Sequence, residues 1–394
     1  MRNVLQVNVR LSEGGAAGVA RTLHDNLRAE GFSSSIAYGY GASGETSPLE
    51  GTYNALRLTA KTRAAVNLVA HRLRGEELLG PTTRVRSELV KSIRAADIVH
   101  LHAIHSYMLP PRELLELISR EGKPVVWTMH DQWLMTGRCA QPGTCEGWRG
   151  GCDPCPFLKA YPPASLDRAA IQFDRRRAAL EQLSETVKVQ IVACAEWLAE
   201  EMRSSGLGDV STVTNSVDNE FWEVSRSVRE NTDSIDEPNF LFMSRDLRDP
   251  VKVDIALLRR IGQAAPGRLT IVGNNMVEGV PGARIIPAIN DRRLMVEQMK
   301  QHSHLIFSSK VDYYPLTIAE ALTAGLKVLA RDSAAAREFS ADDGVRIVED
   351  ESSWESRIRA EQVSSFAPSA RDSDKFAPER MAKQYAAIYR DLLR

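Results

Sequence analysis

Short apolar runs alternate with segments of helical periodicity from the start of the chain. Val4 to Val9 is a β-branched run, and a polar turn with Gly14 and Gly15 separates it from apolar positions at helical spacing between Ala17 and Leu27. Ser35 to Tyr38 can form the next strand. A strand, a glycine-bearing turn, a helix and a strand make a βαβ unit, so the pattern predicts an α/β fold with parallel sheets.

The same pattern continues along the chain and predicts two domains. A polar, charged segment at 219–238 with few apolar positions is typical of a linker between residues 1–218 and 239–375, and residues 376–394 form an amphipathic helix. The strands are predicted at Ile98 to Leu101, Pro124 to Thr128, Ile191 to Cys194 and Ser211 to Thr214, and after the linker at Phe240 to Ser244, Leu269 to Val272, Arg284 to Ile286, His304 to Phe307, Lys327 to Ala330 and Gly344 to Val348.

One stretch combines a strand end, a helix start and two acids. Asp312 follows the run that ends at Phe307, and Pro315 suits the first turn of a helix because it has no N–H to lose. Glu320 lies in that helix and Gly325 is its expected C-cap. The partly positive end of the helix, beside two acids, predicts a site for an anion and a polyol.

Composition excludes some classes of function. The 394 residues are 43% hydrophobic and 26% charged, as in an ordinary globular protein of two domains. Fifty Lys and Arg against 51 Asp and Glu give a net charge of −1, which by itself argues neither for nor against a nucleic-acid partner. We expect no such partner. No apolar run is long enough to span a bilayer and Met1 leads directly into a strand, so we expect a cytoplasmic protein.

A basic helical segment is predicted at 53–75. Its five basic side chains lie among apolar ones. Two interpretations remain, of which the first is slightly favoured: a solvated helix with one face on the domain, or a helix that lies on an anionic membrane surface at the inner leaflet.

Four cysteines form an insert at 136–157. Cys139, Cys145, Cys152 and Cys155 have the spacing C-x5-C-x6-C-x2-C, and C-D-P-C is half of a tetrahedral zinc site. A structural zinc is the first interpretation; two disulfides are the second, and free thiols or an iron–sulfur cluster the third.

Histidines gather at two predicted strand ends. His100, His102 and His105 lie in or after one strand, and His130 follows another. Ligands collect beyond the carboxyl ends of parallel strands, so His130, where its strand ends, is the best functional candidate. His100 is expected inside the strand as a core residue, and the H-x-H-x-x-H pattern is too loose to establish a metal site.

These motifs resemble those of retaining, group 1 glycosyltransferases of the GT-B fold. Asp312 to Glu320 resembles the E-x7-E signature of that family with aspartate first, and S-R-D-L-R-D-P-V-K resembles its V-G-R-x-x-x-x-K turn. Gly14-Gly15-Ala16, T-M-H-D at His130 and T-N-S-V-D at Asp218 resemble further family motifs. The run from His130 to Pro156 resembles a bacterial exopolysaccharide or colanic-acid-type subgroup.

The resemblance implies a fold, a reaction and a set of roles. Two Rossmann-like domains would face a central cleft, with the C-terminal helix packing on the N-terminal domain. Arg245 and Lys252 would hold the diphosphate of a UDP- or GDP-sugar. Glu320 would bind the ribose, Asp312 would bind the sugar, and His130 would position the sugar and the diphosphate without acting as a general base. Further donor contacts are expected at Gly14, Gly15, Arg248, Gly273, Tyr314, Pro315, Leu316 and Thr317.

The implied activity is hexosyl transfer to a glycan or lipid-linked acceptor in bacterial surface polysaccharide biosynthesis. No cofactor is expected for catalysis, because fixed cations replace a divalent metal. A lipid-linked acceptor would allow peripheral contact with the membrane. The alternatives are a sugar-nucleotide 2-epimerase of the same fold and a non-catalytic nucleotide-sugar-binding protein.

Overall fold

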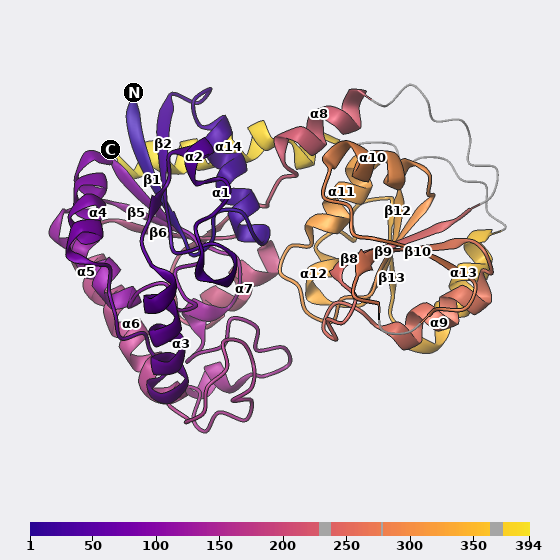
Figure 1. Cartoon of the computed structure of the whole chain (residues 1–394), viewed down its shortest axis with the longest axis horizontal. Coiled ribbons are helices and arrows are strands. Elements are labelled where there is room, and N and C mark those ends of the chain that lie inside the picture. The colour runs from indigo at the N-terminus through magenta and orange to yellow at the C-terminus, as the bar shows by residue number, and fades with distance from the viewer. Residues whose placement is uncertain (228–237, 277–278, 363–372) are drawn as a thin grey trace. The chain divides into compact units, whose positions relative to one another are not determined.

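Two compact α/β units make up the chain. The computed structural model describes residues 1–227, 238–276, 279–362 and 373–394. Unit 1 comprises Met1–Asn215 and Glu379–Arg394, and unit 2 comprises Ser216–Pro378. Each unit contains one parallel sheet with helices on both faces (Figure 1). Two α/β units, each with a parallel sheet, confirm the predicted fold class.

Unit 1 is built on a seven-stranded sheet in the order β3-β2-β1-β4-β5-β6-β7. Its strands are β1 (Arg2–Asn8), β2 (Phe32–Tyr38), β3 (Leu56–Arg57), β4 (Ile98–Leu101), β5 (Val125–Met129), β6 (Val189–Ala193) and β7 (Val210–Thr212). Its helices are α1 (Gly15–Asn26), α2 (Glu50–Tyr53), α3 (Lys61–Arg74), α4 (Thr83–Ala95), α5 (Pro111–Arg120), α6 (Ala169–Thr186), α7 (Glu196–Ser204) and α14 (Pro378–Leu392), with the 3-10 turns η1 (Ala42–Gly44), η2 (Trp133–Met135) and η3 (Gly147–Gly150).

The last helix, α14, completes the core of unit 1. Its Met381, Tyr385 and Tyr389 are fully buried against residues of the central strands and of α1. Tyr389 also packs edge-on against Phe32, with ring centroids 5.3 Å apart. One face of the sheet is therefore covered by α1 together with the C-terminal segment of the chain.

Unit 2 is built on a six-stranded sheet in the order β10-β9-β8-β11-β12-β13. Its strands are β8 (Phe240–Asp246), β9 (Leu269–Asn274), β10 (Ala283–Ile286), β11 (His304–Phe307), β12 (Lys327–Arg331) and β13 (Val345–Val348). Its helices are α8 (Asn219–Ser227), α9 (Ile255–Ala264), α10 (Arg292–Lys300), α11 (Leu316–Ala324), α12 (Ala334–Arg337) and α13 (Trp354–Gln362), with the 3-10 turns η5 (Glu351–Ser353) and η6 (Ser373–Phe376).

Helix α11 begins and ends as its residue types require. Pro315 occupies the N-cap position, just before the helix, and Gly325 ends the helix in the left-handed conformation at φ 92°. A residue with a side chain would be strained there. These two residues fix which positions of the stretch are helical, and so which side of the helix carries Glu320.

Two predicted segments differ from the structure. The segment predicted as a linker, 219–238, begins with α8, because Asp218 accepts a hydrogen bond from the Phe221 N–H (2.8 Å), and Phe221 and Trp222 are buried; residues 228–237 lie outside the described part of the chain. The helix predicted at 53–75 is also shorter than expected. It starts at Lys61, since Leu56–Arg57 instead forms the edge strand β3.

Candidate active site

A pocket of about 410 Å³ lies at the carboxyl edge of the sheet in unit 2. It is lined by the ends of β8 and β11, by the turn before α9 and by the start of α11. The lining residues are Phe242, Met243, Ser244, Arg245, Asp246, Asp249, Lys252, Ile306, Phe307, Ser308, Ser309, Asp312 and Thr317. Four of the predicted donor residues, Arg245, Lys252, Asp312 and Thr317, thus meet in one cavity.

An ion pair joins two of these residues across the pocket. Lys252 Nζ lies 2.7 Å from Asp312 Oδ2, although sixty positions separate the residues in sequence. The other oxygen of Asp312 accepts the N–H of Tyr313 at 2.9 Å. Asp312 is largely buried, whereas Lys252 is 43% exposed and can also reach a ligand. A diphosphate in the pocket would compete with Asp312 for this ammonium group.

Two further groups hold the loops that carry this pair. Asp249 Oδ1 accepts the N–H of Val251 at 2.9 Å, which fixes the turn before Lys252. Arg331, almost buried, donates to the carbonyl of Ser308 (3.1 Å) and pairs with Asp254 (2.6 Å), the N-cap of α9. Arg331 carries no sequence signal other than its position at the end of an apolar strand.

Glu320 does not line this pocket. Its side chain is 12% exposed and its Oε1 lies 3.2 Å from Arg292, which also contacts Asp218 at 2.5 Å. Burial raises the pKa of Glu320 to about 7; Arg292 acts in the opposite direction, and Asp218 adds to the rise. Sequence reasoning missed Arg292, because nothing in the Asp291-Arg292-Arg293 pattern at the start of α10 indicates that partner.

The remaining predicted donor residues of unit 2 have other positions. Arg248 is bound by the carboxylate of Asp246 at 3.1 and 3.0 Å, on the surface. Gly273 serves packing, since a Cβ there would lie 2.3 Å from the Ser244 carbonyl oxygen. Tyr314 is buried against Phe339, with ring centroids 4.8 Å apart. Pro315 and Leu316 form the start of α11.

In unit 1, polar side chains follow one face of the sheet to its carboxyl edge. His100 lies in β4 and His102 directly follows it, and Thr128 lies in β5 and His130 directly follows it. The hydrogen bonds that join these four side chains show that they lie on the same side of the sheet. His100 contacts Tyr389 and Thr128, both at 2.7 Å, and is a core residue as expected. His102 continues the row, with Gln6 and His130 both at 3.0 Å.

The hydrogen bonds of this row assign the protons on its rings. The amide nitrogen of Gln6 donates to Ser34 at 3.0 Å, so its oxygen accepts from His102 Nε2. Burial lowers the pKa of His102 well below its ordinary value, and the neutral ring accepts at Nδ1 from His130 Nε2. Burial also lowers the pKa of His130 to about 4. His130 is therefore a neutral ring at pH 7 with Nδ1 as an acceptor.

The next residue, Asp131, is charged for a local reason. Burial opposes its ionisation, but His105 at 2.8 Å and the N–H of Trp133 at 2.9 Å hold its pKa below the ordinary value. A negative charge thus lies beside a neutral His130. Asp131 orients this turn through its hydrogen bonds to His105 and to the Trp133 N–H, and its charge opposes the lowering of the His130 pKa by burial.

Gly14 and Gly15 form the entrance to α1. Gly14 has φ 89° and Gly15 is the first helical residue; both are exposed. The positive φ explains why glycine occupies position 14. A Cβ on Gly14 would meet no heavy atom within 4 Å, so the N-terminus of α1 is open.

The four cysteines of the insert surround one small void of about 20 Å³. None of them is in a disulfide. Backbone N–H groups of Gly147 and Gly137 donate to the sulfurs of Cys145 (3.4 Å) and Cys152 (3.1 Å). Within the described ranges, no three or more His, Cys, Asp or Glu side chains are arranged to hold a metal ion, so zinc stays a prediction, checked by metal analysis of reduced protein.

Comparisons with known proteins decide the family. Residues 13–221 match the model of Glycosyltransferase Family 4. The chain is 31% identical to WcaC of Escherichia coli (strain K12), assigned to colanic acid biosynthesis as a glycosyl transferase, over 89% of this chain and 88% of that protein. The chain belongs to glycosyltransferase family 4. It is an enzyme, a retaining hexosyltransferase like other members of that family.

Solved structures show the same fold at low identity. HepE of Anabaena, solved in complex with UDP-glucose, has a TM-score of 0.55 and 13% identity, covering 99% of this chain and 95% of that one. Sucrose-phosphate synthase of Thermosynechococcus elongatus has a TM-score of 0.60 and 13% identity, covering 100% and 99%. Among the helices described, none combines the length and apolarity needed to span a bilayer.

Proposed function

We propose that this family 4 enzyme transfers a hexose from a UDP- or GDP-sugar to a glycan or lipid-linked acceptor in bacterial surface polysaccharide biosynthesis. The observation that supports a nucleotide-sugar donor best is the pocket in unit 2, where Arg245 and Lys252 lie with Asp312 and several hydroxyl groups. Cations bind a diphosphate, and a carboxylate with hydroxyl groups binds a sugar.

The relatives support the same substrate classes. HepE was solved with UDP-glucose, and WcaC is assigned to the biosynthesis of colanic acid, an exopolysaccharide. Membership of a glycosyltransferase family disfavours the epimerase alternative, since the family transfers hexoses. A non-catalytic binding protein is disfavoured for the same reason.

In this proposal the pocket divides the donor between charged groups. Arg245 and Lys252 stabilise the negative charge that grows on the diphosphate as the glycosidic bond breaks. Asp312 keeps Lys252 in place and accepts hydrogen bonds from hydroxyl groups of the sugar. Glu320 accepts hydrogen bonds from the ribose hydroxyl groups. Its carboxylate must be ionised for this, despite a pKa of about 7. Arg292 favours that ionised form.

The transfer needs no protein base in this scheme. The acceptor oxygen bonds to the anomeric carbon on the face that the diphosphate leaves, and the carbon–oxygen bond to the phosphate breaks. The acceptor proton passes to the departing phosphate oxygen, so configuration is retained. His130, with a pKa of about 4, is too weak a base for this role at pH 7. Its Nδ1 instead accepts a hydrogen bond from a sugar hydroxyl group.

A donor screen tests the proposal. Purified protein is incubated with UDP- and GDP-hexoses, and nucleotide release by slow hydrolysis without acceptor is measured. Release should occur with one donor and weaken about tenfold or more in Arg245→Ala, which loses a charge-assisted contact. Arg357→Ala, an exposed change on α13 away from the pocket, is the matched control. Equal release by both variants, or no release with any donor, would contradict the proposal.

A further inference from the structure

Helix α3 is amphipathic in the reverse of the usual sense. Its inward residues are small or polar: Asn67 is 0% and His71 3% exposed. Its outward residues include Val66, Val69 and Leu73, which are 42%, 55% and 51% exposed. A helix that only covers a domain would bury such side chains and expose the amide and the imidazole.

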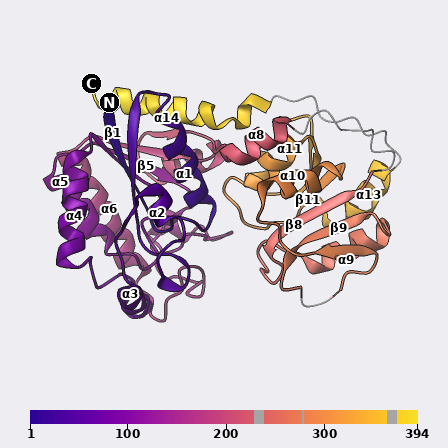
Figure 2. The same ribbon diagram turned by 45° about the horizontal axis from the view of Figure 1, so that its top comes forward.

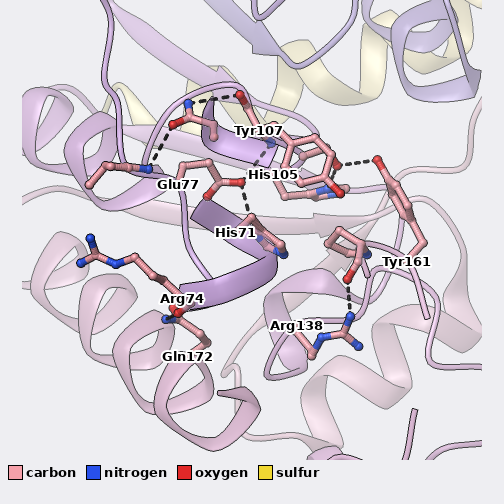
Figure 3. A network of polar contacts seen from close by, with 12 residues as sticks. His71, Arg74, Glu77, His105, Tyr107, Arg138, Tyr161 and Gln172 are labelled. Atoms are coloured by element: carbon pink, nitrogen blue, oxygen red, sulfur yellow. Dashed lines mark hydrogen bonds and ion pairs between the residues drawn. The ribbon is translucent and has the colours of Figure 1, made fainter. Parts of the chain in front are cut away.

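The inward face is held by polar contacts rather than by apolar packing. Asn67 accepts the N–H groups of Leu78 and Leu79 at 3.0 and 2.8 Å and donates to the Leu79 carbonyl at 2.9 Å. His71 lies 3.4 Å from Glu77, and Figure 3 shows this pair together with the contact between Arg74 and Gln172. These contacts fix the rotation of α3, and so they determine that the apolar residues face outward.

Other exposed apolar residues lie beside the same helix. Of the eleven large apolar side chains that are exposed in the described ranges, eight lie in the segments 66–78 and 157–171. The second segment adjoins α3, since the N–H of Ser165 donates to the Arg72 carbonyl at 2.8 Å. Figures 1 and 2 both show α3 next to these loops. The neighbouring exposed residues are Leu78, Phe157, Tyr161, Leu166 and Ile171.

Cations flank the apolar stripe on both sides. With about 100° between successive helical residues, Arg63 and Arg74 lie on one side of the stripe formed by Val66, Val69 and Leu73, and Lys61 and Arg72 lie on the other. Lys61–Arg74 contains no Asp or Glu. An apolar stripe between two rows of Lys and Arg is the pattern of a helix that lies in the interface of an anionic bilayer.

We propose that α3 and the adjoining exposed apolar residues dock this enzyme on an anionic lipid bilayer. The apolar stripe would enter the region between headgroups and acyl chains, while the exposed Arg72 and Arg74, one on each side of it, contact lipid phosphates. The other two cations already have partners, since Lys61 pairs with Glu45 at 2.6 Å and Arg63 donates to the Gly80 carbonyl at 2.9 Å. A second copy of the chain fits the surface less well. In a two-fold contact through the stripe the arginines of both helices would face one another, and the neighbouring acid Glu45 is already paired with Lys61. Docking goes beyond the proposed transfer reaction and does not depend on it.

Vesicle co-sedimentation tests the proposal without using activity. The full chain is mixed with vesicles of phosphatidylglycerol and phosphatidylethanolamine, or of phosphatidylcholine alone, at low and high salt. We expect sedimentation with the anionic vesicles only. It should weaken as salt rises from about 0.1 M to about 1 M, because salt screens the cations from the lipid phosphates.

Two variants separate the parts of the surface. Val66→Ser with Val69→Ser and Leu73→Ser should lower the partition coefficient about tenfold or more at any salt concentration. Arg72→Glu with Arg74→Glu should lower it mainly at low salt. The matched control, Ile285→Ser with Arg284→Glu, changes an exposed apolar and an exposed basic residue of β10 and should bind as the wild type does.

Several outcomes would overturn the proposal. They are equal binding to neutral and anionic vesicles, unchanged binding by the stripe variant, and no binding by the wild type. A concentration-dependent dimer that the stripe variant abolishes would assign the surface to a second copy instead. We expect each variant to fold, since every substituted side chain in α3 lies outside the buried core. Circular dichroism checks this. Failure of docking would leave the donor screen unaffected.

Discussion

Two sets of polar side chains, one at the carboxyl edge of each sheet, differ in charge. In unit 1 the row of His100, His102 and His130 is neutral, because burial lowers the pKa of each ring. In unit 2 the edge carries Lys252 paired with Asp312 and the exposed Arg245. The same strand topology can therefore present neutral hydrogen-bonding groups or charge, depending on whether the side chains lie under the sheet's helices or in an open pocket.

This difference suggests a division of labour. Charged groups are suited to a diphosphate, whose charge grows during the reaction. Neutral rings are suited to hydroxyl groups, which they can bind without attracting a phosphate. In our proposal unit 2 therefore supplies the electrostatic stabilisation, and unit 1 supplies orientation. The effects of substitutions at the two edges on donor turnover and binding should differ in size and in pH dependence.

The largest effect is expected at Lys252. Lys252→Ala removes a cation from the diphosphate and leaves Asp312 as an unpaired charge that repels it. We expect kcat for donor turnover to fall by about a hundredfold or more. Lys252→Arg, which keeps the charge, should recover part of the loss. Steady-state nucleotide release measures both, and a fall of less than about threefold in Lys252→Ala would refute the assigned role.

A smaller, pH-dependent effect is expected at Glu320. Its pKa of about 7 means that the carboxyl gains a proton as pH falls through neutrality, and it then accepts ribose hydroxyl groups less well. The affinity for the donor nucleotide should fall between pH 8 and pH 6, by at most about tenfold per unit for one proton. Titration calorimetry measures this.

Glu320→Gln is the control for the pH effect. It should bind the nucleotide more weakly than the wild type at pH 8, with a flat pH dependence. The stability of the fold should respond in the reverse direction: the folded state holds the proton more tightly than the unfolded chain does, so the contribution of Glu320 falls as pH rises from its ordinary pKa of 4.5 towards 7. A pH dependence that persists in Glu320→Gln would assign the titration to another group.

Much of this arrangement follows from sequence, and the exceptions have physical reasons. Apolar runs show where strands end, and parallel strands end at one edge, so Lys252 and Asp312 could be expected in one site. Pro315 and Gly325 mark the bounds of α11 because each has a backbone preference of its own. The contact of Arg292 with Glu320 and Asp218 could not be predicted from the sequence, since it depends on how α8, α10 and α11 pack.

The boundary errors have a similar origin. Asp218 caps a helix that starts with the apolar residues Phe221 and Trp222. The residues that follow are mostly polar, so the sequence shows no clear helical spacing and predicts a linker. For α3 the exposed and buried faces could not be told apart. The sequence predicts an apolar stripe, and only the contacts of Asn67 and His71 show that this stripe faces outward.

A moderate effect without pH dependence is expected at His130. His130→Ala removes a neutral acceptor and should lower kcat about tenfold, as the loss of one hydrogen bond to a hydroxyl would. Its pKa of about 4 lies far below neutrality, so the rate profile of the wild type should show no step that His130→Ala abolishes between pH 6 and pH 8. Such a step would show that the ring titrates during catalysis and would remove the contrast with Glu320.

The smallest effect on turnover is expected at the inner end of the histidine row. Tyr389→Phe leaves Nδ1 of His100, buried and 2.7 Å from the lost hydroxyl, without its partner. We expect the free energy of unfolding to fall by about 1–3 kcal/mol, because a buried polar group is left unpaired. Chemical denaturation followed by far-UV circular dichroism measures this, and donor turnover should stay at the wild-type level. Since α14 brings Tyr389 from the end of the chain, the same variant tests whether the C-terminal segment serves unit 1 as structure only. A loss of turnover larger than the loss of folded protein would show that the neutral row transmits its arrangement to His130.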